Sequence, residues 1–267
     1  MTTQPAVREG LLTWSPDRGL TPDADPAADG PLLVADSWLL REGRVRGYGR
    51  HRERFLGACG ECGGPPPRRL VEFWQDVTSV LPRTGEWFPR VELAAGSHEL
   101  RLRLRHAPLL GTEVRLWSAA QADPRTVPRR KGPDLDALAR VRSRANGEGA
   151  QEAVLVTAAG LVLESPTASV LWWEDDELCL PPARLPLLPG ITALLVRERA
   201  ERSGIRVAHR ERTLAELDGR EVWLVNALHG IRPVTGWTGT SITPGPAVRA
   251  AEWREWLDGL MEPLPGE

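Results

Sequence analysis

The sequence contains almost no lysine. It has 34 lysine and arginine residues, and Lys131 is the only lysine among them. A general preference for arginine explains the loss of surface lysines, because either residue can serve as a solvated cation. It does not explain why one lysine is retained. A lysine, unlike an arginine, can lose its proton when desolvated and form a Schiff base with a carbonyl. Lys131 is therefore a candidate nucleophile, and chance survival of one lysine in a loop is the alternative.

Cysteine is also scarce. Three cysteines cannot form a disulfide framework. The pair Cys59-Gly-Glu-Cys62 has the spacing of a metal or redox motif, but Cys179 lies far along the chain and no second pair completes a zinc site. We therefore expect no metal site, and we interpret the pair as two small residues near the end of a helix.

Strong net charge and long apolar runs are absent as well. A net charge of −2 gives no reason to expect nucleic acid or an anionic membrane as a partner. No segment approaches the roughly 18 apolar residues of a membrane span, and Met1–Arg8 lacks the apolar region of a secretory signal. Hydrophobic residues make up 41% and charged residues 26%, as in a soluble globular protein. We expect a cytoplasmic enzyme or binding protein that acts on a small molecule.

The distribution of proline and glycine divides the chain into segments. Residues 1–30 are rich in proline, aspartate, alanine and glycine, and we expect them to wrap around the protein or to be poorly ordered, apart from a strand-like run at 11–14. A connector between domains is expected at 119–130. These boundaries predict a smaller N-terminal domain at 31–118 and a larger C-terminal domain at 131–267.

Hydrophobic periodicity predicts more strands than helices, with many connections of hairpin length. This pattern favours a mixed α+β fold over a doubly wound parallel sheet. Helices are expected at 51–59, 70–81, 133–146, 191–203 and 247–260. Strands are expected at 31–40, 44–48, 87–93, 99–105, 113–117, 153–157, 161–165, 169–173, 177–180, 205–211 and 221–226.

The strand expected at 99–105 alternates strictly between leucine and arginine. The alternation puts Arg101, Arg103 and Arg105 on one face and the leucines on the other. Such a row is most often the solvated face of an antiparallel sheet. The alternative is that one or two of these arginines point into a cleft and bind carboxylates through paired hydrogen bonds.

Glu164 ends an otherwise apolar strand. A buried carboxylate is costly unless a cation pairs with it, so Glu164 is either paired in the interior or exposed at a sheet edge. In His51-Arg-Glu-Arg-Phe55, at the start of the first expected helix, either arginine could reach a phosphate, although solvated arginines are common in such places.

Pro189-Gly-Ile-Thr192 opens the helix expected at 191–203 and is a candidate anion site. Gly190 lets the backbone approach a ligand closely. The amides of Ile191 and Thr192, with the Thr192 hydroxyl, face the positive end of the helix. Simple capping of the helix is the alternative.

The order and spacing of these pieces resemble the class IV aminotransferases, which are the fold-type IV pyridoxal 5'-phosphate enzymes. The resemblance runs from about Asp36 to Val234. Its matching pieces are Lys131, Glu164, Leu188-Pro-Gly-Ile-Thr192 and Asn226-Ala-Leu-His-Gly-Ile-Arg-Pro-Val234. The family includes branched-chain and D-amino acid transaminases and aminodeoxychorismate lyase. It implies a smaller N-terminal α/β sandwich, a larger β-barrel-like domain with flanking helices, and homodimers with the active site between the two domains.

The resemblance also implies roles for residues of this chain. Lys131 matches the lysine that forms the Schiff base with pyridoxal phosphate and then moves a proton. Glu164 matches the carboxylate that keeps the pyridine nitrogen protonated. The residues expected around the cofactor, mainly its phosphate, are Arg54, Gly190, Ile191, Thr192, Asn226 and Ala227. The residues expected to bind the substrate are Arg101, Arg103, Arg105 and Leu228.

The sequence departs from the family in two places. Transaminases often have a tyrosine a few residues after the lysine, which bonds the phenolic oxygen of the cofactor, whereas this chain has Pro133-Asp-Leu-Asp136. The asparagine that frequently follows the family's glutamate is replaced by Ser169. The residues Asn226-Ala-Leu228 are most similar to those of the lyase branch, since transaminases tend to have threonine or serine near Ala227.

The resemblance implies a pyridoxal phosphate enzyme. Our first expectation is a lyase that eliminates pyruvate from aminodeoxychorismate and leaves 4-aminobenzoate. The second is a transaminase for branched-chain or D-amino acids. The third is a family member that binds a ligand without turnover, and the missing tyrosine and asparagine motivate it.

Overall fold

The computed structural model describes residues 9–23, 30–118 and 122–266, and its contacts divide the chain into two compact units. Unit 1 comprises Met1–Leu109, Arg130–Pro133 and Leu260–Glu267, and unit 2 comprises Leu110–Arg129 and Asp134–Gly259. The chain enters unit 2 near Leu110, before the connector expected at 119–130, because Gly111 already donates a hydrogen bond to His229 of unit 2 (3.1 Å). It returns to unit 1 for the short segment that contains Lys131.

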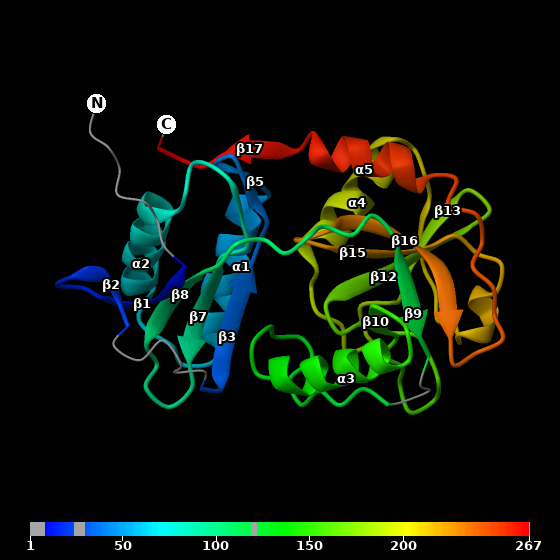
Figure 1. Ribbon diagram of the computed structural model, residues 1–267, viewed down its shortest axis with the longest axis horizontal. Helices are drawn as coiled ribbons and strands as arrows, with labels where there is room; N and C mark the ends of the chain where they lie inside the picture. Colours follow the sequence, from blue (N-terminus) through cyan, green and yellow to red (C-terminus); the bar gives the residue numbers. More distant parts are fainter. Residues whose placement is uncertain (1–8, 24–29, 119–121, 267) are drawn as a thin grey trace. The chain divides into compact units, whose positions relative to one another are not determined.

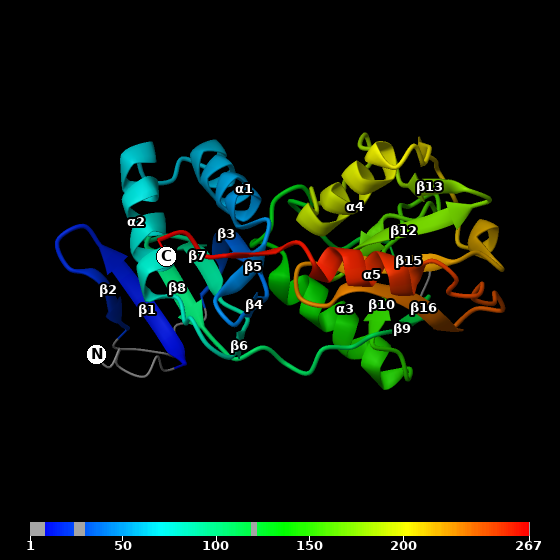
Figure 2. The same cartoon turned by 90° about the horizontal axis from the view of Figure 1, so that it is seen from above.

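Unit 1 is built on a five-stranded antiparallel sheet in the order β2-β1-β8-β7-β3 (Figure 1). Its strands are β1 (Gly10–Ser15), β2 (Gly19–Pro22), β3 (Leu32–Ser37), β7 (Arg90–Ala94) and β8 (Leu100–Leu104). Helices α1 (Tyr48–Glu61) and α2 (Pro67–Val80) lie on one side of this sheet (Figure 2). A second sheet has the order β17-β5-β4-β6 and consists of β17 (Met261–Pro263), β5 (Arg44–Arg46), β4 (Leu40–Arg41) and β6 (Glu86–Trp87).

The core of unit 1 lies between the five-stranded sheet and its two helices. The alternation in β8 buries Leu100, Leu102 and Leu104 in one cluster with Phe55 of α1 and Phe73 of α2. Each large apolar side chain buried in this way contributes roughly 1.5–3 kcal/mol to folding. The same alternation sends the arginines of β8 to the opposite face of the sheet.

In the N-terminal segment, β1 contains the strand-like run expected at 11–14, whereas β2 at Gly19–Pro22 was not expected. Strands β1 and β2 form a hairpin that extends the sheet, and β1 pairs with β8. Leu11 and Trp14 are buried, and Nε1 of Trp14 donates to Asp76 of α2 at 2.7 Å. Burial of these apolar side chains outweighs the turn-rich composition around them. The rest of the segment expected to wrap or to be poorly ordered, residues 1–8 and 24–29, lies outside the described residues.

Unit 2 contains a sheet in the order β10-β9-β16-β15-β12-β13-β14, and β11 pairs with β12. Its strands are β9 (Val114–Trp117), β10 (Glu152–Ala153), β11 (Glu164–Ser165), β12 (Ala168–Glu174), β13 (Glu177–Leu180), β14 (Val207–His209), β15 (Val222–Asn226) and β16 (Gly230–Thr238). Its helices are α3 (Leu135–Gly147), α4 (Ile191–Arg202), the short 3-10 helix η1 (Ala215–Leu217) and α5 (Ala250–Asp258). Figure 1 shows β12, β15 and β16 side by side in unit 2.

The mixed α+β fold predicted from the sequence is confirmed, and each expected helix is present with its ends shifted by no more than one turn. Strand β16 was not expected, because Pro233 lies inside it and proline removes a backbone donor from a sheet. Pro233 lies opposite Trp223 of β15, and the register with β9 shifts between Val234 and Gly236. Among the described residues, no helix has the length and apolar content needed to cross a membrane.

Candidate active site

Lys131 lies in unit 1 beside the edge strand β3. The backbone N–H of Ala35 donates to the carbonyl of Lys131 at 2.7 Å. The next residue, Gly132, has a φ of 135°, and a Cβ added there would lie 2.9 Å from backbone atoms of Val34 and Ala35. Only glycine tolerates this backbone conformation and this close approach. The fit of Gly132 against β3 therefore fixes the point from which the lysine side chain starts.

The surroundings of Lys131 favour its neutral form. Burial lowers the pKa of Lys131 from the usual 10.5 to about 8. The positive charge of Arg54 acts in the same direction, Asp36 opposes it, and Arg90 and Arg105 add smaller effects. The residue as a whole keeps some solvent exposure. A useful fraction of the amine is therefore unprotonated near neutral pH and able to attack a carbonyl.

Asp36 organises the contacts around Arg54. Its fully buried carboxylate accepts hydrogen bonds from Nε and Nη2 of Arg54 at 2.8 Å each, and Nδ1 of His51 lies 2.8 Å from Oδ1. Burial alone would raise the pKa of Asp36, but the charges and hydrogen bonds of Arg54 and His51 lower it below its usual range. The carboxylate is ionised, and it holds the guanidinium expected to bind phosphate in one orientation.

The arginine face of the unit 1 sheet is largely covered rather than solvated. Nε of Arg103 donates to Glu92 of β7 at 3.1 Å, and Nε of Arg90 donates to the same carboxylate at 2.6 Å. Nε of Arg105 donates to the carbonyl of Phe88 at 2.8 Å, and its guanidinium lies 4.7 Å from the centre of that ring. Burial and the charges of Arg90 and Arg103 lower the pKa of Arg105 to about 10. One glutamate thus faces three arginines, and this excess of positive charge suits a carboxylate.

Arg101 lies at the other end of β8. Its Nη2 donates to Glu99 at 2.6 Å, and its Cα is paired with Thr13 of β1 and Glu92 of β7. The charge of Arg105, at the opposite end of the row, contributes to lowering the pKa of Lys131.

In unit 2, Glu164 is a buried carboxylate with a cationic partner. Nη1 of Arg125 donates to Oε1 of Glu164, and so does the backbone N–H of Leu188 at 2.9 Å. Arg125 also makes a two-point contact with Asp123, at 2.8 Å from Nε and 2.7 Å from Nη2. Burial lowers the pKa of Arg125, but the hydrogen bonds to Asp123 and the charge of Glu164 outweigh it and raise that pKa. Of the two alternatives for Glu164, the structure has the paired one.

Strand β12 connects Glu164 to the helix expected to hold the phosphate. Ser169 of β12 is in register with Glu164 of β11, and its hydroxyl would lie 2.5 Å from a Cβ placed on Gly190. Gly190 is the N-cap of α4, and both Ile191 and Thr192 are buried in the first turn. The first amides of an α-helix have no intrahelical acceptor, and the helix dipole adds attraction for an anion. Ser169 therefore links the two: it pairs with Glu164 in the sheet and lies against Gly190, at the start of the expected anion site.

The loop Asn226-Ala-Leu228 follows β15 next to β12, where Val225 is in register with Ser169. Oδ1 of Asn226 accepts hydrogen bonds from the backbone N–H groups of Leu228 at 3.1 Å and His229 at 2.7 Å. Its Nδ2 donates to the carbonyl of Thr167 at 3.3 Å. Asn226 therefore shapes a tight turn that carries Ala227 and Leu228, both of them partly exposed.

The segment that lacks the family tyrosine contains Asp134 instead. The Asp134 carboxylate accepts hydrogen bonds from the amide and hydroxyl of Thr126, both at 2.9 Å, and from the amide of Val127 at 2.8 Å. An ionised carboxylate is an acceptor only. Asp134 closes a turn before α3 and does not replace the hydrogen bond that a tyrosine hydroxyl donates.

The two cysteines of the C-x-x-C pair lie at the C-terminal end of α1, where Cys62 is the C-cap. Cys59 is fully buried in α1, and burial raises its pKa to about 12. Sγ of Cys62 donates to the carbonyl of Cys59 at 3.5 Å. Within the part of the chain that the structure describes, no three residues of histidine, cysteine, aspartate or glutamate are grouped so that they could hold a metal ion.

Each unit, taken by itself, contains residues that suit one part of a phosphorylated pyridine aldehyde. Unit 2 supplies a helix N-terminus for the phosphate and, beside it, a buried carboxylate for a ring nitrogen. Unit 1 supplies a lysine whose pKa is lowered enough for it to attack an aldehyde. Residues of these kinds are the ones that enzymes of the pyridoxal phosphate class use.

The family model for amino-transferase class IV matches residues 33–237, so the chain belongs to this family of pyridoxal phosphate-dependent enzymes. Aminodeoxychorismate lyase from Vibrio harveyi is 29% identical over 102 residues, which are 37% of this chain and 38% of that protein. The match thus spans well under half the length of this curated relative.

Solved structures show the same fold. A hypothetical aminotransferase from Mycobacterium tuberculosis, in the form with alpha-ketoglutarate and PMP bound, is 21% identical, with a TM-score of 0.76 over 93% of this chain and 98% of that one. The branched-chain amino acid aminotransferase of Escherichia coli is 17% identical, with a TM-score of 0.78 over 94% of each chain. These likenesses confirm the expected fold-type IV architecture.

Two residues of the candidate site were missed from the sequence. Asp36 ends the apolar run Leu32-Leu-Val-Ala-Asp36, which is the same signal that drew attention to Glu164, and it could have been found in that way. Arg125 lies in a proline-containing segment that was interpreted as a connector, and nothing in the sequence distinguishes it from the other arginines there.

Proposed function

We propose that this enzyme is a lyase that eliminates pyruvate from aminodeoxychorismate and leaves 4-aminobenzoate. The curated relative from Vibrio harveyi is an aminodeoxychorismate lyase, and the residues of the Asn226-Ala-Leu228 loop resemble those of the lyase branch. The observation that carries the chemistry is Lys131, the only lysine of the chain, with a pKa of about 8.

Pyridoxal phosphate, when bound, supplies an aldehyde for amines and a ring that withdraws electrons. Lys131 would attack that aldehyde and, once displaced by the substrate amine, would take a proton from the substrate and return one as a general base and acid. Burial raises the pKa of Glu164, and the charge and hydrogen bond of Arg125 oppose this shift. The Glu164 carboxylate would face the ring nitrogen and hold it protonated. The first amides of α4, at Ile191 and Thr192, would bind the phosphate. Arg54 matches the phosphate-binding arginine of the family, and we assign it that role on this resemblance.

The arginine face of unit 1 supports a substrate with carboxylates. We propose that Arg105 binds one carboxylate of the substrate, because its charge acts on Lys131 and its guanidinium is held by the carbonyl and ring of Phe88. Replacing Arg105 with glutamine removes a charge-assisted interaction, which is typically worth about 1.5–3 kcal/mol. The expected result is a KM raised about tenfold or more, with a smaller change in kcat. Replacing Arg101, which pairs with Glu99, should change KM much less.

A transaminase for branched-chain or D-amino acids is the second candidate. The solved structures with this fold include aminotransferases, and this likeness motivates it. The presence of Asp134 in the segment where transaminases often have a tyrosine argues against it, because an ionised carboxylate cannot donate the hydrogen bond that a tyrosine hydroxyl donates to the cofactor.

Two assays on the purified holoenzyme separate the candidates. The first measures pyruvate and 4-aminobenzoate released from aminodeoxychorismate. The second measures consumption of branched-chain and D-amino acids with 2-oxoglutarate as acceptor. Pyruvate release without amino transfer supports the lyase, and amino transfer without pyruvate release overturns it. We also propose a homodimer, following the family, and light scattering of the purified protein tests this.

A further inference from the structure

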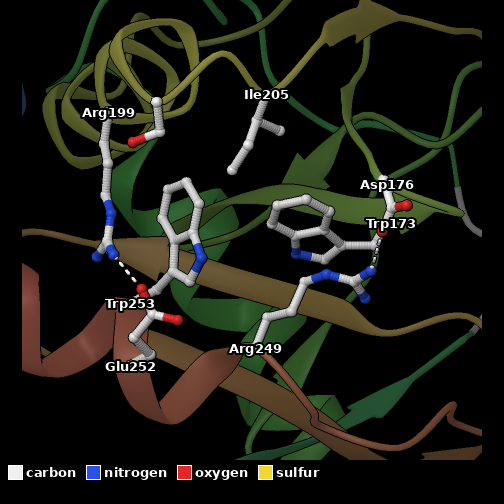
Figure 3. Close-up of a pocket in the computed structure, with 8 residues that line it drawn as sticks. Trp173, Asp176, Arg199, Ile205, Arg249, Glu252 and Trp253 are labelled. Carbon is white, nitrogen blue, oxygen red and sulfur yellow. Dashed lines mark hydrogen bonds and ion pairs between the residues drawn. The ribbon is translucent and has the colours of Figure 1, made fainter.

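Unit 2 contains a pocket that is separate from the residues proposed to hold the cofactor. It has a volume of about 340 Å³ and is formed by α4, α5 and the β12–β13 turn (Figure 3). Thr192 lies in the first turn of α4, whereas Arg199 lies about 10 Å further along the helix axis, at a rise of roughly 1.5 Å per residue. The volume falls in the range of small-molecule sites, roughly 300–1,000 Å³.

Two indole rings and an isoleucine form the apolar part of the pocket. Trp173 of β12 and Trp253 of α5 meet edge to face, with ring centroids 5.6 Å apart. Figure 3 shows the two indole nitrogens on the sides of the rings that face each other, and Ile205 points toward the same space. A flat apolar group can pack here against rigid surfaces, which hold it at little entropic cost.

Two arginines border the pocket, and each is paired with a carboxylate that also lines it. Arg249 contacts Asp176 at 2.9 Å, and the buried carboxylate of Glu221 lies 3.6 Å from it. The guanidinium of Arg249 lies 4.6 Å from the centre of the Trp173 ring, and that of Arg199 lies 4.4 Å from the Trp253 ring. Arg199 is paired with Glu252, whose side chain is 75% exposed. Because the carboxylates of Glu252 and Asp176 are exposed to solvent, each of these pairs contributes little, about 0–1 kcal/mol, and an incoming anion can compete for the guanidinium.

Two buried donors in the pocket have no hydrogen-bond partner among the described residues. They are Nε1 of Trp173, on a residue that is 4% exposed, and Nη1 of Arg199. A buried polar group left without a partner costs about 1–3 kcal/mol. Because both atoms are donors, an occupant that stabilises the pocket must supply acceptor oxygens.

We propose that this pocket binds a small aromatic carboxylate. The carboxylate accepts hydrogen bonds from Trp173 and Arg199, and the aromatic ring packs against Ile205 and the indole of Trp253. A cationic ligand could contact Asp176 and Glu252, which also line the pocket, but it would leave the donors of Trp173 and Arg199 without an acceptor. This binding site goes beyond the proposed function, because it shares no residue with the site built on Lys131, Glu164 and the N-terminus of α4.

Calorimetric titration of the holoenzyme with benzoate tests the proposal. We expect saturable binding that Arg199→Gln and Trp173→Phe each weaken about tenfold, since each removes one of the two unpaired donors. Arg197→Gln removes a guanidinium from the same helix outside the pocket and should leave the Kd unchanged. Glu252→Gln removes the carboxylate that competes for Arg199 and should tighten binding about threefold.

The Lys131→Ala enzyme should retain benzoate binding. Loss of binding in that variant, with retention in Arg199→Gln, would place benzoate elsewhere and overturn the proposal. So would the absence of any binding heat at about 10 mM benzoate, where even a millimolar site is mostly filled. Equal affinity for hexanoate would overturn the aromatic class. Trp173 is in the core, so if Trp173→Phe fails to fold, the opposite shifts expected for Arg199→Gln and Glu252→Gln still decide the outcome.

Discussion

Arg125 and Glu164 form a buried ion pair in unit 2, with Nη1 of the guanidinium donating to Oε1 of the carboxylate. The same guanidinium holds Asp123, and the same carboxylate oxygen accepts the amide of Leu188. Three segments far apart in the sequence thus meet at one pair. The carboxylate proposed to face the cofactor is therefore fixed in position before any cofactor binds.

Replacing Arg125 with glutamine should destabilise the protein and weaken its hold on pyridoxal phosphate. Glu164 would remain buried without its cation, and breaking a buried pair in this way typically costs about 3–5 kcal/mol. Urea unfolding of the cofactor-free protein measures the loss. Arg129→Gln is the matched control, because Arg129 lies in the same segment, is exposed and donates only to backbone carbonyls. Equal unfolding free energies of the two variants would show that the Arg125–Glu164 pair does not contribute to stability.

Replacing Gly132 with alanine should displace Lys131. The new Cβ would lie 2.9 Å from the backbone of β3, at a φ of 135° that other residues rarely adopt. We expect a loss of about 1–3 kcal/mol in unfolding free energy together with loss of cofactor binding. Gly149→Ala is the control, since Gly149 has a φ of 75° but no atom within 4 Å of the added Cβ. A Gly132→Ala enzyme with normal cofactor affinity would contradict the packing argument.

Amine-specific labelling should find an unusually acidic lysine. In the cofactor-free protein, labelling of Lys131 should rise with a midpoint near pH 8, whereas the unfolded chain should show a midpoint near 10.5. Peptide mass spectrometry separates Lys131 from the N-terminal amine, which titrates near pH 8 in any state. Because the folded protein binds this proton more weakly than the unfolded chain, its stability should also rise between these two pH values. A native midpoint above pH 10 would rule out the desolvated amine.

Replacing Asp36 with asparagine should destabilise the protein in a pH-dependent way. Its pKa is lower in the folded state than the usual 3.8, so its contribution is fully present above that value and declines as the pH falls toward the folded pKa. The difference in unfolding free energy between wild type and Asp36→Asn should be constant between about pH 5 and 7 and shrink below pH 4. A difference that stays constant down to pH 3 would contradict an ionised Asp36 paired with Arg54.

Local patterns were sufficient to predict most of the helices and strands. Leucine alternation placed the core face of β8, and Gly190 with Thr192 marked the start of α4. Strand β16 was missed because Pro233 is a strong local signal against a strand, while its position between β15 and β9 is decided by long-range pairing. Short-range preferences lose to such pairing when the flanking residues are deeply buried.

The candidate site could be predicted where chemistry limits the choice of residue. Lys131 was identified because no other side chain of the sequence can form a Schiff base with an aldehyde, and Glu164 because an apolar strand rarely ends in a carboxylate without a reason. Arg125 was missed because 33 of the cations are arginine and a single guanidinium carries no distinctive sequence context. The burial of the arginine side chains of β8 also depends on tertiary packing, which the alternation of leucine and arginine in the sequence does not reveal.

The most direct test of the account is to locate the covalent attachment of the cofactor. The protein purified with pyridoxal phosphate should show the visible absorbance of a lysine-bound cofactor, and borohydride should remove this band. Peptide mass spectrometry should then find the reduced pyridoxyl group on Lys131, and the Lys131→Ala protein should lack it. A colourless wild-type protein, or a pyridoxyl group found only on the N-terminal amine, would contradict the central claim.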